Sequence, residues 1–287
     1  MSKIAISAVV LAIAGGGLTI GGMSQLGFDP KALSGAESEY TESYAFAVEE
    51  VQKWRIEMPY GQVKIQTSNE VESIVVDAES NQKEEWKFTV EEACLHIRGS
   101  GFAYEWWNMF GNWNKKMNLT ITVPEDYFVS DLHLSVSAGT IEIDGLSFGS
   151  VFTSLSAGNI VLSDIRGTRF QARNSAGTTK ISRSDVEELD LDVSAGEFIL
   201  DLIRFDRLRF DISAGSLEAD VIGSLEEYTV DIDVSAGDCN LLDRVGTTEK
   251  SIQGDISAGS ARFDFTSKRR FAFLSKKRKK KAVSRTA

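Results

Sequence analysis

Seven serines with a regular spacing are the first candidates for chemistry in this 287-residue chain. Each lies in a Ser-Ala-Gly tripeptide, and successive tripeptide glycines are 19, 19, 19, 19, 22 and 22 residues apart. A serine nucleophile needs a neighbouring base, and His133 is the only histidine near the repeats. We therefore predict that the tripeptides are structural corners. Their glycines are Gly139, Gly158, Gly177, Gly196, Gly215, Gly237 and Gly259.

A set of aspartates recurs in the later repeats, at positions expected to face outward. Three interpretations are open: a solvated face, which we favour; weak Ca²⁺ binding by oxygen ligands; or the carboxylates of a polysaccharide-cleaving β-helix. Regular spacing argues against the third, because an active site interrupts a repeat. The aspartates are Asp190, Asp192, Asp211, Asp231, Asp233 and Asp255.

The two cysteines, Cys94 and Cys239, exclude a disulfide framework and a CxxC metal site, because 145 positions separate them. Cys239 falls in an apolar column of the repeat and is predicted to pack as a small hydrophobic residue. We expect no metal ion and no cofactor.

The C-terminal segment carries ten basic residues and no acidic one from Lys268 onward. The formal net charge is -11, and removing this segment leaves 21 basic against 42 acidic residues. Such a cluster favours contact with anionic lipid or a wall polymer. No folded recognition element accompanies the cluster, so we do not expect a nucleic-acid partner. The six clustered residues are Lys276, Lys277, Arg278, Lys279, Lys280 and Lys281.

An aromatic segment at 102–116 contains three of the five tryptophans, Trp106, Trp107 and Trp113. One interpretation is a loop that buries its rings as a cap on the repeats. The alternative is an exposed patch that binds a membrane interface or stacks on sugars.

The repeat determines the predicted fold. Apolar residues alternate before each tripeptide, as at Leu132, Leu134 and Val136, and again after it, as at Ile141 and Ile143. Alternation with period two indicates strands with one buried face, and the change of phase requires a corner, where glycine can adopt positive φ. We predict that the alanine turns inside this corner. The expected fold is all-β, a single parallel β-solenoid with 19–22-residue repeats, preceded by an N-terminal transmembrane helix.

Five segments are expected along the chain. Residues 1–23 carry Lys3 and then an uncharged apolar run long enough to cross a bilayer; a cleaved signal peptide is the alternative. Residues 24–43 form a linker, 44–130 an N-terminal β region that caps the solenoid, 131–267 the repeats and 268–287 a basic disordered tail. Lys3 favours an orientation with the bulk of the chain outside the cytoplasm.

The Ser-Ala-Gly strand repeat, entered through Leu119–Pro124 and the run from Leu132 to Val136, resembles the bacterial β-strand-repeat family known as putative adhesins, of otherwise unknown function. The resemblance covers about residues 44–267. It implies a β-solenoid at the bacterial cell envelope, with some members linked to envelope stress, and it supplies no catalytic residues.

We therefore predict a non-enzymatic, membrane-anchored envelope protein that acts as an adhesin, scaffold or binding module at the bacterial cell membrane. It would cross the membrane once, with the bulk of the chain extracytoplasmic and with the membrane, anionic lipid, a wall polymer or envelope proteins as partners. The alternatives are a carbohydrate-active β-helix enzyme and a cytoskeletal solenoid that polymerises on the inner membrane face.

Overall fold

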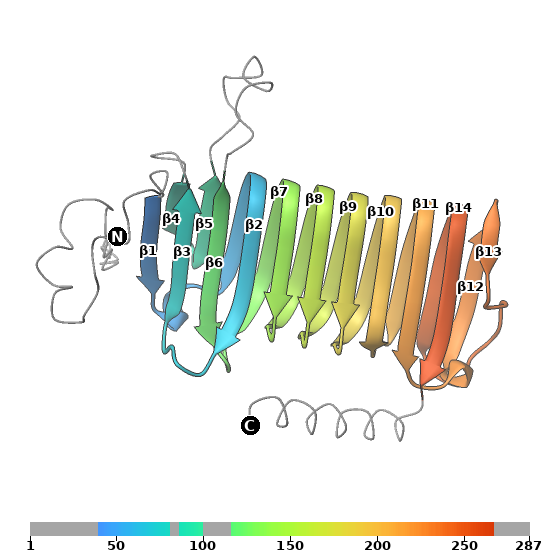
Figure 1. Ribbon diagram of the computed structural model, residues 1–287. Coiled ribbons are helices and arrows are strands. Elements are labelled where there is room, and N and C mark those ends of the chain that lie inside the picture. The colour runs from blue at the N-terminus through green and yellow to red at the C-terminus, as the bar shows by residue number, and fades with distance from the viewer. Residues whose placement is uncertain (1–39, 81–85, 100–115, 267–287) are drawn as a thin grey trace, which may run out of the picture.

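The computed structural model describes residues 40–80, 86–99 and 116–266, and they form one long row of paired strands (Figure 1). The strands that precede the repeats are β1 (Tyr40–Phe46), β2 (Lys53–Ser68), β3 (Ile74–Ser80), β4 (Trp86–Glu91), β5 (Cys94–Gly99) and β6 (Met117–Pro124). The repeat strands are β7 (Phe128–Asp144), β8 (Ser147–Ser163), β9 (Arg166–Ser182), β10 (Asp185–Ile203), β11 (Arg207–Ile222), β12 (Tyr228–Val234), β13 (Gly237–Cys239) and β14 (Lys250–Thr266). Two short 3-10 helices, η3 (Val48–Glu50) and η5 (Leu225–Glu227), complete the described elements.

Each long repeat strand bends at its tripeptide into two arms. We call the residues before the tripeptide the first arm and those after it the second arm. Neighbouring coils pair in parallel along both arms, and the tripeptide glycines lie opposite one another. Leu132 and Leu134 of the first arm and Ile141 of the second arm are all buried. The core therefore lies between the two arms, as period-two alternation predicts.

The tripeptide corner differs from its prediction in one respect. In every tripeptide the serine and the alanine are exposed, so the alanine lies on the outer edge of the solenoid. The pairing register passes from Val136 to Ala138 without Ser137, and the same break recurs in the later coils. The change of phase therefore occurs at the serine, which is left out of the ladder as in a β-bulge.

The tripeptide glycines are required mainly by close packing between coils. A Cβ atom added to Gly177 would lie 1.8 Å from the carbonyl oxygen of Gly158. Positive φ, the predicted reason, holds at five of the seven glycines but not at Gly196 and Gly215, where the added Cβ would still lie 2.1 and 2.2 Å from the preceding glycine's carbonyl oxygen. A column of backbones in direct contact explains why the glycine recurs.

The coils follow chain order only as far as β11. In space β14 lies between β11 and β12, so the last repeat in the sequence is the penultimate coil of the solenoid (Figure 1). Its second arm supplies Ala261, Phe263 and Phe265 at alternate positions, and these residues pack in or against the core. After β13, by contrast, Leu242 and Asp243 leave the apolar pattern. The longer apolar arm therefore takes the position beside β11.

The loop 240–249 covers the free edge of β12. Val230 and Arg244 exchange two backbone hydrogen bonds of 2.9 and 3.0 Å. The backbone N–H of Ile232 donates to a carboxylate oxygen of Asp243 at 3.2 Å. These contacts satisfy edge groups that could otherwise pair with another chain.

The other end of the solenoid is closed by a two-sided cap. The first arm of β2 pairs with β5, and β4 adds to it antiparallel, whereas the second arm of β2 pairs with β6, followed by antiparallel β3 and β1. β2 is itself a coil with a corner, because Gly61 lies opposite Gly139 and has φ of 113°. The sequence prediction missed this corner, since Pro59 and Tyr60 replace the serine and alanine.

The predicted transmembrane segment 1–23, residues 24–39 of the predicted linker 24–43 and the basic tail from residue 268 lie outside the described residues. Residues 40–43 of that linker belong to β1 instead. Within residues 40–80, 86–99 and 116–266, no helix is both long and apolar enough to cross a membrane.

Candidate functional site

A groove on the outer face of the first arms is the site with the most varied chemistry. Trp54, Ile56, Leu95 and Ile97 are buried at alternate positions of β2 and β5. The alternation directs the intervening polar side chains outward. β4 extends this surface because it pairs antiparallel with β5. Strand alternation at the cap thus gathers polar residues from three strands.

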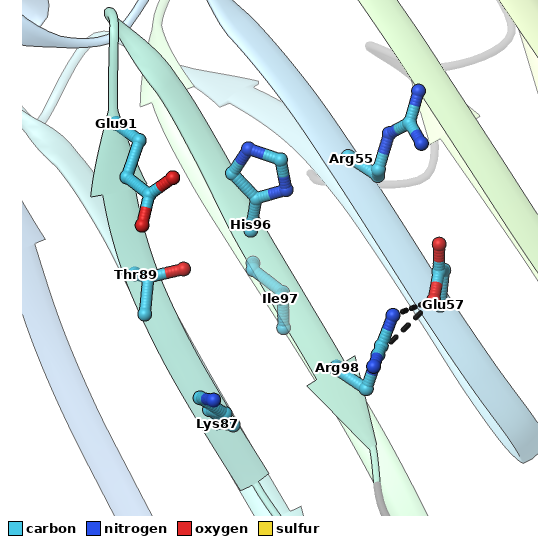
Figure 2. Close-up of a pocket in the computed structure, with 8 residues that line it drawn as sticks. All are labelled: Arg55, Glu57, Lys87, Thr89, Glu91, His96, Ile97 and Arg98. Carbon is cyan, nitrogen blue, oxygen red and sulfur yellow. Dashed lines mark hydrogen bonds and ion pairs between the residues drawn. The ribbon is translucent and has the colours of Figure 1, made fainter.

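The groove has a volume of about 200 Å³ and is shown in Figure 2. Arg98 donates to one carboxylate oxygen of Glu57 through two nitrogens, at 2.8 and 3.1 Å. Figure 2 shows this pair and shows no such contact for Arg55. We call this site the Arg55 groove; its lining residues are Arg55, Glu57, Lys87, Thr89, Glu91, His96, Ile97 and Arg98.

Arg55 lies between the chain's only two histidines. It is opposite His96 of β5 on one side and opposite His133 of β7 on the other. Strands in a sheet are about 4.8 Å apart, so the Arg55 side chain has a histidine on each neighbouring strand. Partial burial, and next the nearby Arg55 charge, lower the pKa of His133 below its usual 6.5.

An aromatic and cationic cluster continues the outer face beyond the groove. The His133 imidazole and the Phe152 ring lie 4.7 Å apart between centroids, at an interplanar angle of 30°. The Arg173 guanidinium lies 5.5 Å from the centroid of the Phe152 ring. Phe152 therefore has a ring partner on one neighbouring strand, His133 of β7, and a cationic partner on the other, Arg173 of β9.

The distal half of the same outer face is acidic. Four aspartates lie directly opposite one another on neighbouring coils: Asp192, Asp211, Asp255 and Asp233. Among the residues that the structure describes, no group of three potential ligands is placed to hold a metal ion. Another carboxylate of the first arm of β10 is neutralised, because Glu188 forms ion pairs with both Arg169 and Arg207. These pairs hold the pKa of Glu188 below its usual range, Arg207 contributing most.

The sequence predictions of site residues have different outcomes. The seven tripeptide glycines line up in one column along the outer corner of the solenoid. The predicted tryptophans, Trp106, Trp107 and Trp113, and the lysine cluster 276–281 lie outside the described residues. Cys239 packs partly buried against the core, opposite Ala261, as its predicted column requires.

The sequence prediction did not single out the Arg55 groove. Lys87 and His96 lie on the adjacent strands β4 and β5, but Arg55 lies on β2, which is distant in the sequence, and no repeat links them. The detectable signal was local: each is a polar residue between two apolar ones, so each faces outward. Their proximity depends on the parallel pairing of β2 with β5, which the spacing of the residues does not reveal.

No curated protein matches the sequence. A solved structure of a putative adhesin from Bacteroides fragilis covers 80% of this chain and 98% of its own, at 12% identity and a TM-score of 0.48. A putative adhesin from Parabacteroides distasonis covers the same shares at 12% identity and a TM-score of 0.44. The model of one protein family, described as Toastrack DUF4097, matches residues 51–286, and the chain therefore belongs to this family.

Proposed function

We propose that this protein is a non-enzymatic binding module of the bacterial envelope, anchored in the membrane by its N-terminal segment, with the solenoid outside the cytoplasm. Its partner in this proposal is an extended envelope polymer that lies across the outer face of the first arms. The putative adhesins among its structural neighbours are consistent with a binding role, but the proposal depends on the surface of this chain.

The observation that carries the proposal is one straight row of outward side chains. Each residue of the row lies opposite the next on six neighbouring strands, from β4 to β9, over about 24 Å at the usual strand spacing. Over these six strands the row contains no carboxylate and includes the stacked His133 and Phe152 rings. The next position of the same line, on β10, is Asp190, which accepts a hydrogen bond from Gln171. Its members are Thr89, His96, Arg55, His133, Phe152 and Gln171.

Such a row suits a polymer better than a small substrate. Flat aromatic and imidazole surfaces favour the faces of rings, and polar side chains at a fixed interval can contact successive units of a chain. A rigid sheet also presents these groups without ordering them on binding, which reduces the entropic cost of association.

Two experiments on the full-length protein test this proposal. In protoplasts, added protease should cleave the solenoid while the N-terminal segment stays in the membrane fraction. Protection of the solenoid, or its presence in the soluble fraction, would contradict the proposed location.

The protein should also sediment with purified envelope polymer and leave the polymer's length distribution unchanged. Failure to sediment would refute the binding role, and shortening of the polymer would indicate an enzyme.

A further inference from the structure

We propose that the Arg55 groove binds a phosphate group, with Arg55 as the main ligand and His96 and His133 as flanking hydrogen-bond donors. This inference rests on the proposed function, because it names the chemical group of the envelope ligand that this surface would bind. The group could be a phosphodiester of a polymer or the headgroup of a phospholipid, since both present the same tetrahedral oxyanion.

The first argument is that Arg55 is available. Glu57, two residues away on the same strand, is engaged by Arg98. Within the described residues, no carboxylate forms an ion pair with Arg55, and the Arg55 side chain is exposed. A guanidinium presents N–H donors in a planar fork that fits two oxygens of one phosphate. Arg55 can therefore offer its whole fork to a ligand.

The second argument is the arrangement of donors around Arg55. The imidazoles of His96 and His133 lie on adjacent strands on either side, and a neutral imidazole still carries one N–H donor. Lys87 lies opposite Arg98 at the edge of the groove, and no carboxylate in the described part of the chain pairs with it. Arg55, His96 and Lys87 therefore line the groove from three strands, and His133 of a fourth strand lies next to Arg55 just beyond it.

The third argument is the contrast in charge along the face. The groove is lined by three cations, Arg55, Lys87 and Arg98, against the two carboxylates of Glu57 and Glu91. The distal coils instead present the column of four aspartates, which repels an anion. A phosphate that approaches this face is therefore directed to the cap end, where the net charge of the lining is positive.

The test compares two arginines that share one row of the outer face. Arg209 of β11 is also exposed, and it lies opposite Asp190 in the acidic half, so Arg209→Gln makes the same charge change away from the groove. Full-length protein in an uncharged detergent is titrated calorimetrically with a glycerol phosphate oligomer. Arg55→Gln should weaken this binding about tenfold or more, because it removes charge-assisted hydrogen bonds, whereas Arg209→Gln should not weaken it.

A second experiment identifies the source of the phosphate. The same proteins are floated with vesicles of phosphatidylglycerol and phosphatidylcholine in equal parts, and the basic tail is retained in every variant so that its contribution cancels. If Arg55→Gln loses more binding than Arg209→Gln on the vesicles but not on the oligomer, the ligand is a lipid headgroup. If the larger loss of binding occurs on the oligomer but not on the vesicles, the ligand is a polymer. Thermal unfolding of each variant confirms that it is folded, and His133→Gln with His96→Gln provides a second variant that leaves Arg55 in place.

Equal binding of the oligomer and the vesicles by Arg55→Gln and Arg209→Gln would overturn the phosphate site. That result is distinct from failure of the proposed function, which is judged by whether the wild-type protein sediments with envelope polymer. Displacement of the oligomer by inorganic phosphate, and not by chloride at the same ionic strength, should accompany a true phosphate site. Displacement by both salts alike would indicate charge screening and would also overturn the site.

Discussion

The side chain of Asn240 makes both of the backbone hydrogen bonds that a neighbouring strand would make to Phe263. Its amide nitrogen donates to the Phe263 carbonyl at 2.8 Å, and its amide oxygen accepts from the Phe263 N–H at 2.8 Å. β13 ends one residue earlier, at Cys239. One side chain thus satisfies the edge of β14 at the position where the outermost strand stops.

Asn240→Ala should therefore destabilise the distal end of the solenoid. The loss of two hydrogen bonds at a partly exposed edge should cost about 1 kcal/mol, and the released Phe263 groups should increase self-association. Urea unfolding and sedimentation velocity measure the two effects. Asn159→Ala, at an exposed second-arm position, is the matched control. An Asn240→Ala protein as stable and as monomeric as this control would contradict the role of Asn240.

At the tripeptide, the structure predicts opposite sensitivities for alanine and glycine. Ala195 is exposed, so Ala195→Leu should change the free energy of unfolding by about 0.5 kcal/mol or less. Gly177→Ala should cost about 3 kcal/mol, because the added Cβ would meet the Gly158 carbonyl oxygen at 1.8 Å and φ is 130°. Denaturant unfolding of the two variants measures the difference. If Ala195→Leu lost more unfolding free energy than Gly177→Ala, the alanine would have to face the inside of the corner.

A buried polar pair in β9 should be replaceable at a gain in stability. The Asn174 amide donates to the Thr179 hydroxyl at 3.2 Å across the core, but the Asn174 side-chain oxygen has no partner. The neighbouring β8 coil has Leu155 and Ile160 at the equivalent positions. Asn174→Leu with Thr179→Ile should raise the free energy of unfolding by about 1–2 kcal/mol, since an unsatisfied buried group is removed. Thermal unfolding measures it, and a lower melting temperature would show that the pair is needed for packing.

His133 should make stability depend on pH. Its pKa in the folded chain is lowered, chiefly by burial and then by Arg55, while Asp131 and Glu57 oppose the shift. Between this pKa and about 6.5, the unfolded chain binds more protons than the folded chain, so stability rises with pH across that window. The stability that depends on a neutral His133 is fully present above about pH 6.5 and is lost as the pH falls through the window.

His133→Gln should remove this part of the pH dependence. Urea unfolding at pH values on both sides of 6.5 measures it, and Ser135→Ala, two residues along the same arm, serves as the non-titrating control. If the free energy of unfolding depends on pH as steeply in His133→Gln as in the wild-type protein, other groups cause the dependence.

The regular part of the fold was predictable because each repeat carries its own pattern. Alternation at Leu132, Leu134 and Val136 identifies a buried face, and the glycine marks the corner. The orientation of the alanine was predicted wrongly, because alternation alone does not show which residue of the tripeptide is left out of the ladder. The site was not predictable in the same way: Arg55, His96 and His133 become neighbours only through long-range pairing of β2 with β5 and β7.

The place of β14 between β11 and β12 also constrains how the solenoid is completed during translation. β8 to β11 each emerge from the ribosome directly after the strand with which they pair, so coils can be added one by one. β12 is synthesised before β14, yet β14 provides the edge on which β12 pairs. A nascent chain that stops before residue 250 would thus leave the edge of β11 bare and residues 228–249 without their partner strand. The final repeat to be translated, β14, is the one that lies between the coils of β11 and β12. Until it is synthesised, the partly formed solenoid has an edge strand open to association with other chains.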